Sequence, residues 1–225
     1  MALKDKLNLS QDDILKALDE LYKKSIDGLP VVSKPISEFA NDYISKHNTV
    51  ADATKAMLKN QITKCTTSGF ITGFGGAITL PITIPANISS VLYVQMRMIA
   101  CAAYMNGFEL NSDQVQTLVY SCLAGVSVNE IAKQFGVALG GKLAVKGIQK
   151  IPGKVLLKIN QKIGFRLITK FGEKGLINLG KMVPVVGAIV NGGFDLVETK
   201  AIASRAYKTF VEKNFNVGEP INIDQ

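Results

Sequence analysis

Apolar residues recur three and four positions apart along much of the chain. In residues 11–24 the apolar positions are Ile14, Leu15, Leu18, Leu21 and Tyr22. In residues 50–71 they include Val50, Ala53, Met57, Leu58, Ile62 and Cys65. Side chains with this spacing share one face of an α-helix. The pattern predicts an all-α protein with helices over 11–24, 36–46, 50–71, 114–123 and 126–139.

Capping residues and helix breakers indicate where these helices begin and end. Ser10 and Asp13 form a capping-box-like start, and Thr49 and Ser112 precede two later helices; a side-chain oxygen at this position accepts a backbone N–H. Residues 27–30 (Asp-Gly-Leu-Pro) end the first helix, and residues 30–35 predict an extended linker. We expect an N-terminal helical arm over 1–50, a helical domain over 51–215 and a flexible tail over 216–225.

The most apolar stretch runs from Gly69 to Gly107 and is rich in residues that turn or break helices. Between Leu80 and Met105 its only formal charge is Arg97. A second stretch of similar style begins at Gly180 and leads into a helix with Asp195 and Glu198. Glycine permits sharp turns and proline stops or starts helices, so both stretches predict Gly/Pro-broken apolar helical hairpins within a compact multi-helix bundle. The predicted turn residues are Gly73, Gly75, Gly76, Pro81, Pro85, Pro184 and Gly187.

An arginine on an apolar helix is costly to bury unless it is paired, and carboxylates are its best partners. We therefore predict that Arg97 forms a buried ion pair with Asp195 or Glu198. A pair of this kind would fix the register of two helices. The alternative is that Arg97 anchors a lipid phosphate or a carboxylate in an apolar pocket.

The same stretches carry the pattern GF-x-TGFGG-x-ITLP-x-TIP, then Q-x-R-x-IA and Y-x-NG-x-EL, and near the end PVVG followed by Thr199, Ala203 and Phe210. This pattern resembles the signature of the EcsC protein family over about residues 51–213. The resemblance implies a mainly helical bacterial protein without an established chemistry. The family's name comes from a gene that neighbours an ABC transporter involved in secretion and competence.

Composition permits one large domain but no simple membrane anchor. The 225 residues are 47% hydrophobic, with a mean hydropathy of +0.20. A spanning helix needs roughly 20 uninterrupted apolar residues, whereas residues 84–104 contain Asn87, Ser89, Ser90, Gln95 and Arg97. A re-entrant or interfacial insertion stays open. The N-terminus has no apolar signal region, so we expect a cytoplasmic protein.

Charge is concentrated in one segment. Residues 142–181 hold ten basic residues and one acid, Glu173, while the whole chain has a net charge of +8. The basic residues recur at every fourth position, and we call them the basic belt: Lys142, Lys146, Lys150, Lys154, Lys158, Lys162, Arg166, Lys170 and Lys174. A fourfold spacing drifts by about 40° per step around a helix, so the belt forms a slow spiral beside apolar residues. Pro152-Gly153, Gly164 and Gly172 predict that it is divided into two or three helices.

Basic amphipathic helices suit an anionic lipid surface. The belt is equally typical of the solvated face of ordinary core helices. Nucleic acid fits it less well, because few aromatic residues are available to stack on bases and no nucleic-acid-binding motif is present. We expect no nucleic-acid partner.

Candidate chemistry is sparse. Cys65, Cys101 and Cys122 are odd in number and widely spaced, which predicts reduced, buried thiols. His47 is the single histidine and cannot build a metal site or a catalytic triad alone. The GFGG segment lacks the lysine of a phosphate-binding loop. We therefore expect a protein that is not an enzyme and has no cofactor or metal site.

These observations predict a peripheral membrane protein at the inner face of the membrane, which binds anionic lipid through the basic belt and the Gly/Pro hairpin. One alternative is an accessory protein that binds a transporter or secretion component. A further alternative is a soluble carrier of an apolar ligand.

Overall fold

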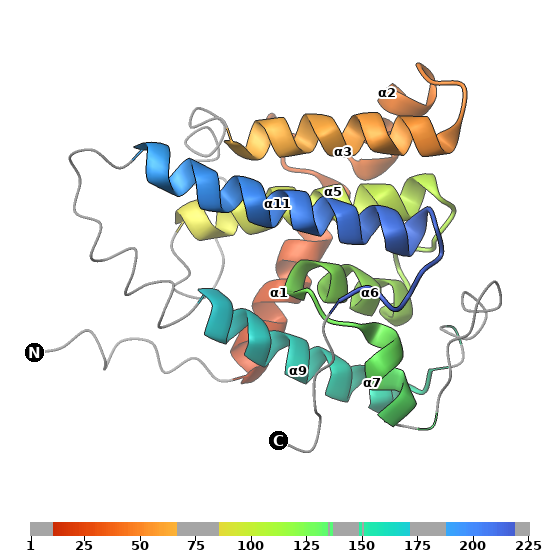
Figure 1. Ribbon diagram of the computed structural model, residues 1–225, viewed down its shortest axis with the longest axis vertical. Helices are drawn as coiled ribbons and strands as arrows, with labels where there is room; N and C mark the ends of the chain where they lie inside the picture. The colour runs from red at the N-terminus through yellow and green to blue at the C-terminus, as the bar shows by residue number, and fades with distance from the viewer. Residues whose placement is uncertain are drawn as a thin grey trace, which may run out of the picture.

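The structure is a computed structural model that describes residues 11–66, 86–134, 136, 149, 151–171 and 188–218. Within these ranges the chain forms eight packed α-helices and no strand (Figure 1), which confirms the predicted all-α fold. The helices are α1 (Gln11–Asp27), α2 (Ile36–Ile44), α3 (Val50–Thr66), α5 (Ala86–Met105), α6 (Asp113–Ala124), α7 (Val128–Gln134), α9 (Gly153–Phe171) and α11 (Ala188–Phe210).

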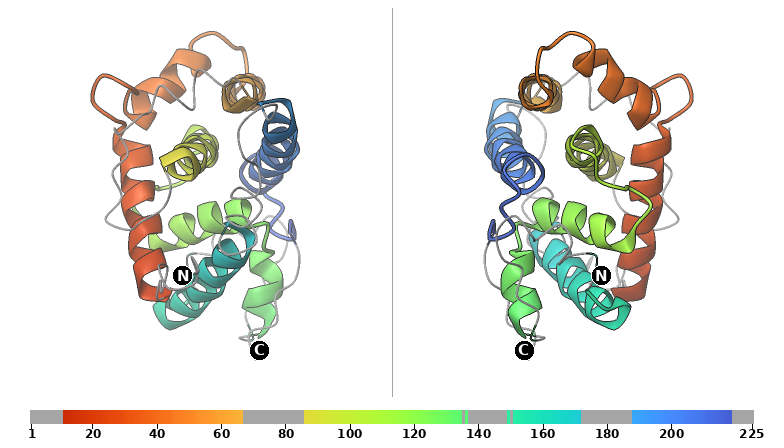
Figure 2. Two further views of the ribbon diagram at one scale, coloured as in Figure 1. Left: turned by 90° about the vertical axis from the view of Figure 1, so that its left-hand side faces the viewer. Right: turned by 90° about the vertical axis from the view of Figure 1, so that its right-hand side faces the viewer.

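Helix α5 is the centre of the bundle. It packs against α1, α2, α3, α6 and α11, which surround it in the end-on views of Figure 2. Every residue from Leu92 to Ala103 is buried, including the polar Gln95 and Arg97. A helix that is apolar on all sides belongs inside a protein, and the low charge of this segment therefore explains its position.

Helices α1 and α2, which belong to the predicted N-terminal helical arm, pack into the same hydrophobic core as α5. Leu18, Leu21, Tyr22 and Ile36 are all buried in that core. The segment between the two helices is a tight turn, so the predicted extended linker is wrong. The Leu29 amide donates to the Ser33 carbonyl oxygen at 3.1 Å, and the Ser33 amide donates to the Leu29 carbonyl oxygen at 2.9 Å. Gly28, at φ +80°, makes the chain reversal possible.

The predicted caps of two helices are confirmed. The Ser112 hydroxyl accepts the Val115 amide at the start of α6, and the Thr49 hydroxyl accepts the Asp52 amide at the start of α3. Gly125 ends α6 in a left-handed conformation at φ +72°, at the break expected between the helices 114–123 and 126–139. The following helix, α7, covers Val128–Gln134 of the expected 126–139.

Two long helices continue through glycines, and one of these, Gly164, is a position that the sequence predicts as a break. Helix α9 runs through Gly164, and α11 runs through Gly192 and Gly193. One glycine inside a helix costs about 1 kcal/mol relative to alanine. Packing of α9 against α1 and α6 outweighs that cost, since Ile159, Ile163 and Leu167 are buried.

The chain stays attached to the bundle up to the point where the flexible tail is expected to begin, at residue 216. Phe215 is buried, and its carbonyl oxygen accepts the Asn129 amide at 3.3 Å. Asn216 accepts a hydrogen bond from the side chain of Asn129. Residues 219–225 lie outside the described part of the chain. The segment after α11 thus returns to α7.

Candidate functional site

Arg97 lies on α5 and joins it to the turn between α1 and α2. Its Nη1 donates to the Ser25 carbonyl oxygen at 2.9 Å, and its Nη2 donates to the Lys34 carbonyl oxygen. The guanidinium carbon also lies 4.8 Å from the centre of the Phe39 ring, in cation–π geometry. Arg97 is only 5% exposed, and burial lowers its pKa. Two carbonyl dipoles and an aromatic face therefore solvate a buried cation.

The predicted ion pair between Arg97 and Glu198 is wrong. Glu198 instead accepts from Nη2 of Arg205 on its own helix at 3.3 Å. The reason is that Gln95 and Arg97 lie on different faces of α5. The Gln95 side chain faces α11 and donates a hydrogen bond to the Thr199 hydroxyl at 3.0 Å. Arg97 follows two residues later, about 200° around the helix, and so points away from α11. The side chain of Asp195 lies outside the described residues.

The turn held by Arg97 is fixed by other contacts as well. The Ser33 and Tyr93 hydroxyls are 2.6 Å apart, and the Ser33 hydroxyl also accepts the Leu29 amide at 2.9 Å. At the tip, Val31 is fully exposed at φ +66°. Arg97 is therefore a positioning residue for this turn, and its covered guanidinium does not favour the ligand-anchor alternative.

The basic belt is described over α9. Lys154 and Lys158 are exposed, whereas Lys162 and Arg166 are half-buried. This change follows the drift of about 40° per step that a fourfold spacing gives. Lys170 lies on α9, but its side chain is outside the described residues. So are Lys142, Lys146, Lys150 and Lys174.

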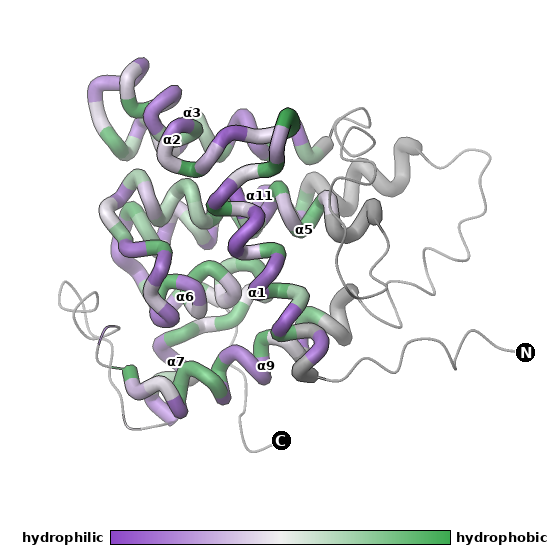
Figure 3. The backbone as a smooth tube through the Cα atoms, turned by 180° about the vertical axis from the view of Figure 1, so that it is seen from behind, coloured by the Kyte–Doolittle hydropathy of each residue, from purple (hydrophilic) through white to green (hydrophobic). Residues whose placement is uncertain are grey.

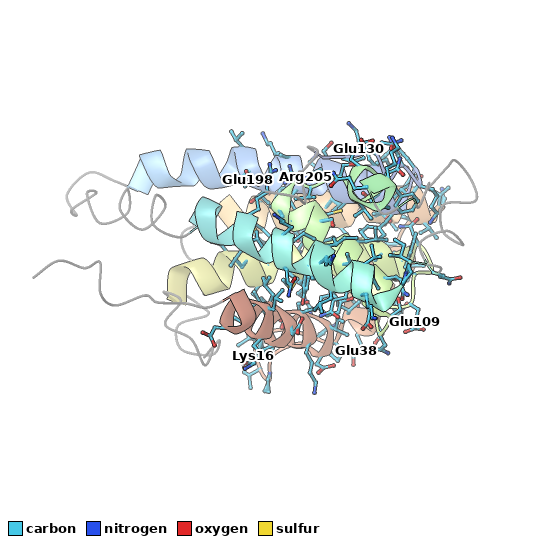
Figure 4. The ribbon with its side chains drawn as sticks, turned by 90° about the horizontal axis from the view of Figure 1, so that it is seen from below. Lys16, Glu38, Glu109, Glu130, Glu198 and Arg205 are labelled. Atoms are coloured by element: carbon cyan, nitrogen blue, oxygen red, sulfur yellow. The ribbon has the colours of Figure 1, made fainter. Side chains whose placement is uncertain are left out.

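Helix α9 is amphipathic and forms one outer side of the bundle, as Figure 4 shows from below. Leu156, Ile159, Ile163 and Leu167 face the core, and apolar and polar residues alternate along the helix in Figure 3. The outer face carries Lys154, Leu157 and Lys158, and Leu157 is 54% exposed. Helix α9 contains five basic residues and no acid. It can therefore present a leucine between two cations to a surface.

A pocket of about 460 Å³ lies where α9, α11 and the end of α6 meet. Among the described residues, the charged side chains that line it are Arg166, Glu198 and Arg205. It thus joins one residue of the predicted basic belt to one of the acids predicted to pair with Arg97. The other described residues that line it are Ala124, Gly125, Ala201, Ser204 and Gly218. Its charged wall does not favour a carrier of apolar ligands.

Arg205 is the residue of this pocket that sequence reasoning missed. Its Nε donates to the Cys122 carbonyl oxygen at 2.7 Å, in the last turn of α6. A cation at this end of a helix interacts favourably with the helix dipole. The sequence offers one signal: Arg205 follows Glu198 by seven residues, two helical turns, which places both on one face of α11.

The cysteines are free and buried, as predicted. Burial raises the pKa of Cys101 to about 12 and that of Cys122 to about 11, so both stay protonated at neutral pH. Within the described residues, no cluster of histidine, cysteine and acidic side chains could hold a metal ion. The predicted turn residues Gly73, Gly75, Gly76, Pro81, Pro85, Pro184 and Gly187 lie outside the described part of the chain.

In the part of the chain that the structure describes, no helix has the length and apolar character that crossing a membrane requires. The resemblance to the EcsC family stays a prediction from the sequence. Comparisons with protein-family models, with curated proteins and with solved structures found no match to this chain.

Proposed function

We propose that this protein binds peripherally to anionic membranes through the outer face of α9. The observation that carries the proposal is the arrangement of Lys154, Leu157 and Lys158, in which an exposed leucine lies between two exposed lysines. A basic face with an apolar residue at its centre suits the headgroup region of a bilayer. Helix α9 has no acid that would repel anionic lipid.

The expected binding is reversible. Each lysine or arginine close to an anionic leaflet contributes about 1 kcal/mol. The two exposed lysines of this face therefore supply about 2 kcal/mol, and Leu157 adds apolar burial. Lys142, Lys146 and Lys150 precede α9 in the sequence and extend the belt. A protein with this affinity would exchange between membrane and solution.

Vesicle flotation tests the proposal. Purified protein is mixed with neutral or anionic vesicles at low and high salt. We expect flotation with anionic vesicles alone and its loss in high salt, since salt screens exposed charges. Flotation that does not depend on the salt concentration would indicate apolar insertion instead. An absence of flotation in every condition would contradict lipid binding.

A second candidate is an accessory that binds a transporter or secretion component, and the tip at Val31 and Val32 favours it. Val31 is fully exposed in a left-handed conformation that β-branched residues rarely adopt. Strained, exposed residues in well-anchored turns are found at binding sites. Photo-crosslinking in cells from position 31, with position 46 as control, tests this candidate. One adduct specific to position 31 supports it, and identical results at both positions contradict it.

A further inference from the structure

We infer that the pocket between α9 and α11 is a binding site for a phosphate group, carried by a lipid headgroup or by a soluble phosphate ester. The site is distinct from the outer face of α9, since neither Lys154 nor Lys158 lines it. It would exist whether or not that face binds a membrane. The inference rests on the geometry of Arg205, on the other residues that line the pocket and on its size.

Arg205 is held in a fixed orientation at the pocket wall. Its Nε is bound to the Cys122 carbonyl oxygen at 2.7 Å, and its Nη2 lies 3.3 Å from the Glu198 carboxylate. Nη1 lies against Gly125, where an added Cβ would be only 3.2 Å away. The absence of a side chain at position 125 therefore leaves room for the Arg205 guanidinium. An oriented guanidinium is the group best suited to bind phosphate oxygens in pairs.

Two further groups converge on the same space. Arg166 reaches the pocket from α9, and Ser204 lies next to Arg205 on α11. Figure 4 shows Glu198 and Arg205 along α11, with α9 in front of them. Arginine and serine side chains donate hydrogen bonds to phosphate oxygens, and serine can do so without adding charge. Most polar side chains in the described part of the wall are therefore hydrogen-bond donors.

The charge and size of the pocket fit a phosphate group. In the described part of the lining, two arginines and one glutamate give a net positive charge, and a phosphate monoester is an anion. The contact between Glu198 and Arg205 is long and partly exposed, with side-chain exposures of 29% and 18%. Such pairs contribute little stability, so a phosphate can compete with Glu198. A volume of about 460 Å³ lies within the range of small-molecule sites.

Glu198 provides a test whose sign separates this inference from a purely structural ion pair. If Glu198 occupies Arg205 in the absence of ligand, Glu198→Gln frees a donor and should strengthen phosphate binding about threefold to tenfold. Arg166→Gln should weaken it about tenfold, because one charged hydrogen-bond donor is lost. Lys208→Gln is the matched control, since Lys208 is exposed on the same helix and does not line the pocket.

The experiment is an NMR titration of the full chain with inorganic phosphate, with chloride at equal ionic strength as reference. We expect the amide resonances of Gly125 and Ser204 to shift with phosphate and not with chloride. The phosphate affinity should change as given above in Glu198→Gln and Arg166→Gln, and Lys208→Gln should bind phosphate as the parent does. Unfolding temperatures of all variants confirm that they fold. The inference would be overturned if Glu198→Gln bound phosphate no more tightly than the parent. It would also be overturned if Lys208→Gln weakened binding as much as Arg166→Gln does, or if the amides of the pocket did not shift.

A second arm identifies the source of the phosphate. Vesicles with phosphatidic acid and vesicles with phosphatidylserine are compared at equal surface charge. Preference for phosphatidic acid that Arg166→Gln abolishes would assign the phosphomonoester of a lipid headgroup, whereas equal binding to both lipids that Arg166→Gln leaves unchanged would assign a soluble ester. The phosphate titration contains no membrane, so failure of the lipid proposal and failure of this site are observed separately.

Discussion

Nη1 of Arg97 donates a hydrogen bond to the carbonyl oxygen of Ser25 over 2.9 Å. Ser25 lies in the last turns of α1, and Arg97 also binds the Lys34 carbonyl oxygen just before α2. One buried cation thus connects the central helix to both sides of a turn. This relationship gives the polar residue in the most apolar helix a structural role.

Replacing Arg97 should destabilise the protein and loosen the turn. Arg97→Gln removes charged hydrogen bonds to two buried carbonyl groups and should lower the free energy of unfolding by about 3 kcal/mol. Urea denaturation measures this loss. Hydrogen exchange should show that the amides of Leu29 and Ser33 exchange faster by local opening, while the Val115 amide changes only with global stability. Equal acceleration at all three amides would contradict the local role.

Gly28 and Gly107 form a matched pair that tests the packing of the same turn. Both are left-handed, at φ +80° and +78°. A Cβ at Gly28 would lie 2.7 Å from the Lys34 carbonyl oxygen, whereas a Cβ at Gly107 would meet nothing within 4 Å. Gly107→Ala should therefore cost about 1 kcal/mol from backbone strain, and Gly28→Ala clearly more. Similar denaturation midpoints for the two variants would show that the turn is not packed as described.

Two neighbouring leucines test the orientation of α9. Leu156 is 3% exposed and Leu157 is 54% exposed. Leu156→Ala should lower the free energy of unfolding by about 2–5 kcal/mol, the usual cost of a core cavity. Leu157→Ala should change it by less than about 0.5 kcal/mol and should weaken vesicle binding. The opposite order in thermal or urea denaturation would mean that α9 is rotated on the core.

Stability should fall in alkaline solution because buried thiols resist ionisation. Burial raises the pKa of Cys101 from 9.0 to about 12 in the folded chain. The unfolded chain therefore releases this proton at a lower pH than the folded chain does. The contribution of the Cys101 thiol to the free energy of unfolding is complete below pH 9 and is lost as the pH rises towards 12. The expected slope is about 1.4 kcal/mol per pH unit for this group.

Urea unfolding at pH 8, 9.5 and 10.5 measures that slope. Burial also raises the pKa values of Cys122, Tyr22 and Tyr120, so the total slope is steeper than one group gives. Cys101→Ala should reduce the slope by about 1.4 kcal/mol per pH unit, the value for one proton, whatever its effect on the free energy of unfolding at neutral pH. An unchanged slope in this variant would contradict the burial of Cys101.

Local signals in the sequence were sufficient to predict most helix starts. The caps at Thr49 and Ser112 and the left-handed stop at Gly125 act within a few residues of where they stand. Gly164 was misread as a break because its cost of about 1 kcal/mol is outweighed by packing between distant elements. The boundary at Gly28 was predicted, but the tight turn after it depends on Arg97 and Tyr93 of α5.

The partners of buried polar residues could not be predicted from the sequence. Arg97 and Gln95 are two positions apart on one helix, yet one faces the turn after α1 and the other faces α11. The pocket likewise joins Gly125, Arg166 and Arg205, which are separated by tens of residues and meet through packing alone. The belt itself was predicted by its fourfold spacing, because that property is local.

The most direct test of the central claim compares two double variants of equal charge in flotation with anionic vesicles. Lys154→Glu with Lys158→Glu alters the outer face of α9. Lys46→Glu with Lys59→Glu makes the same change in net charge at exposed positions in and before α3, across the bundle from α9 in Figure 1. We expect the α9 variant to bind anionic vesicles at least about 30-fold more weakly than the parent. The control variant should bind nearly as well as the parent. Equal losses in the two variants would show that overall charge, and not the face of α9, governs binding.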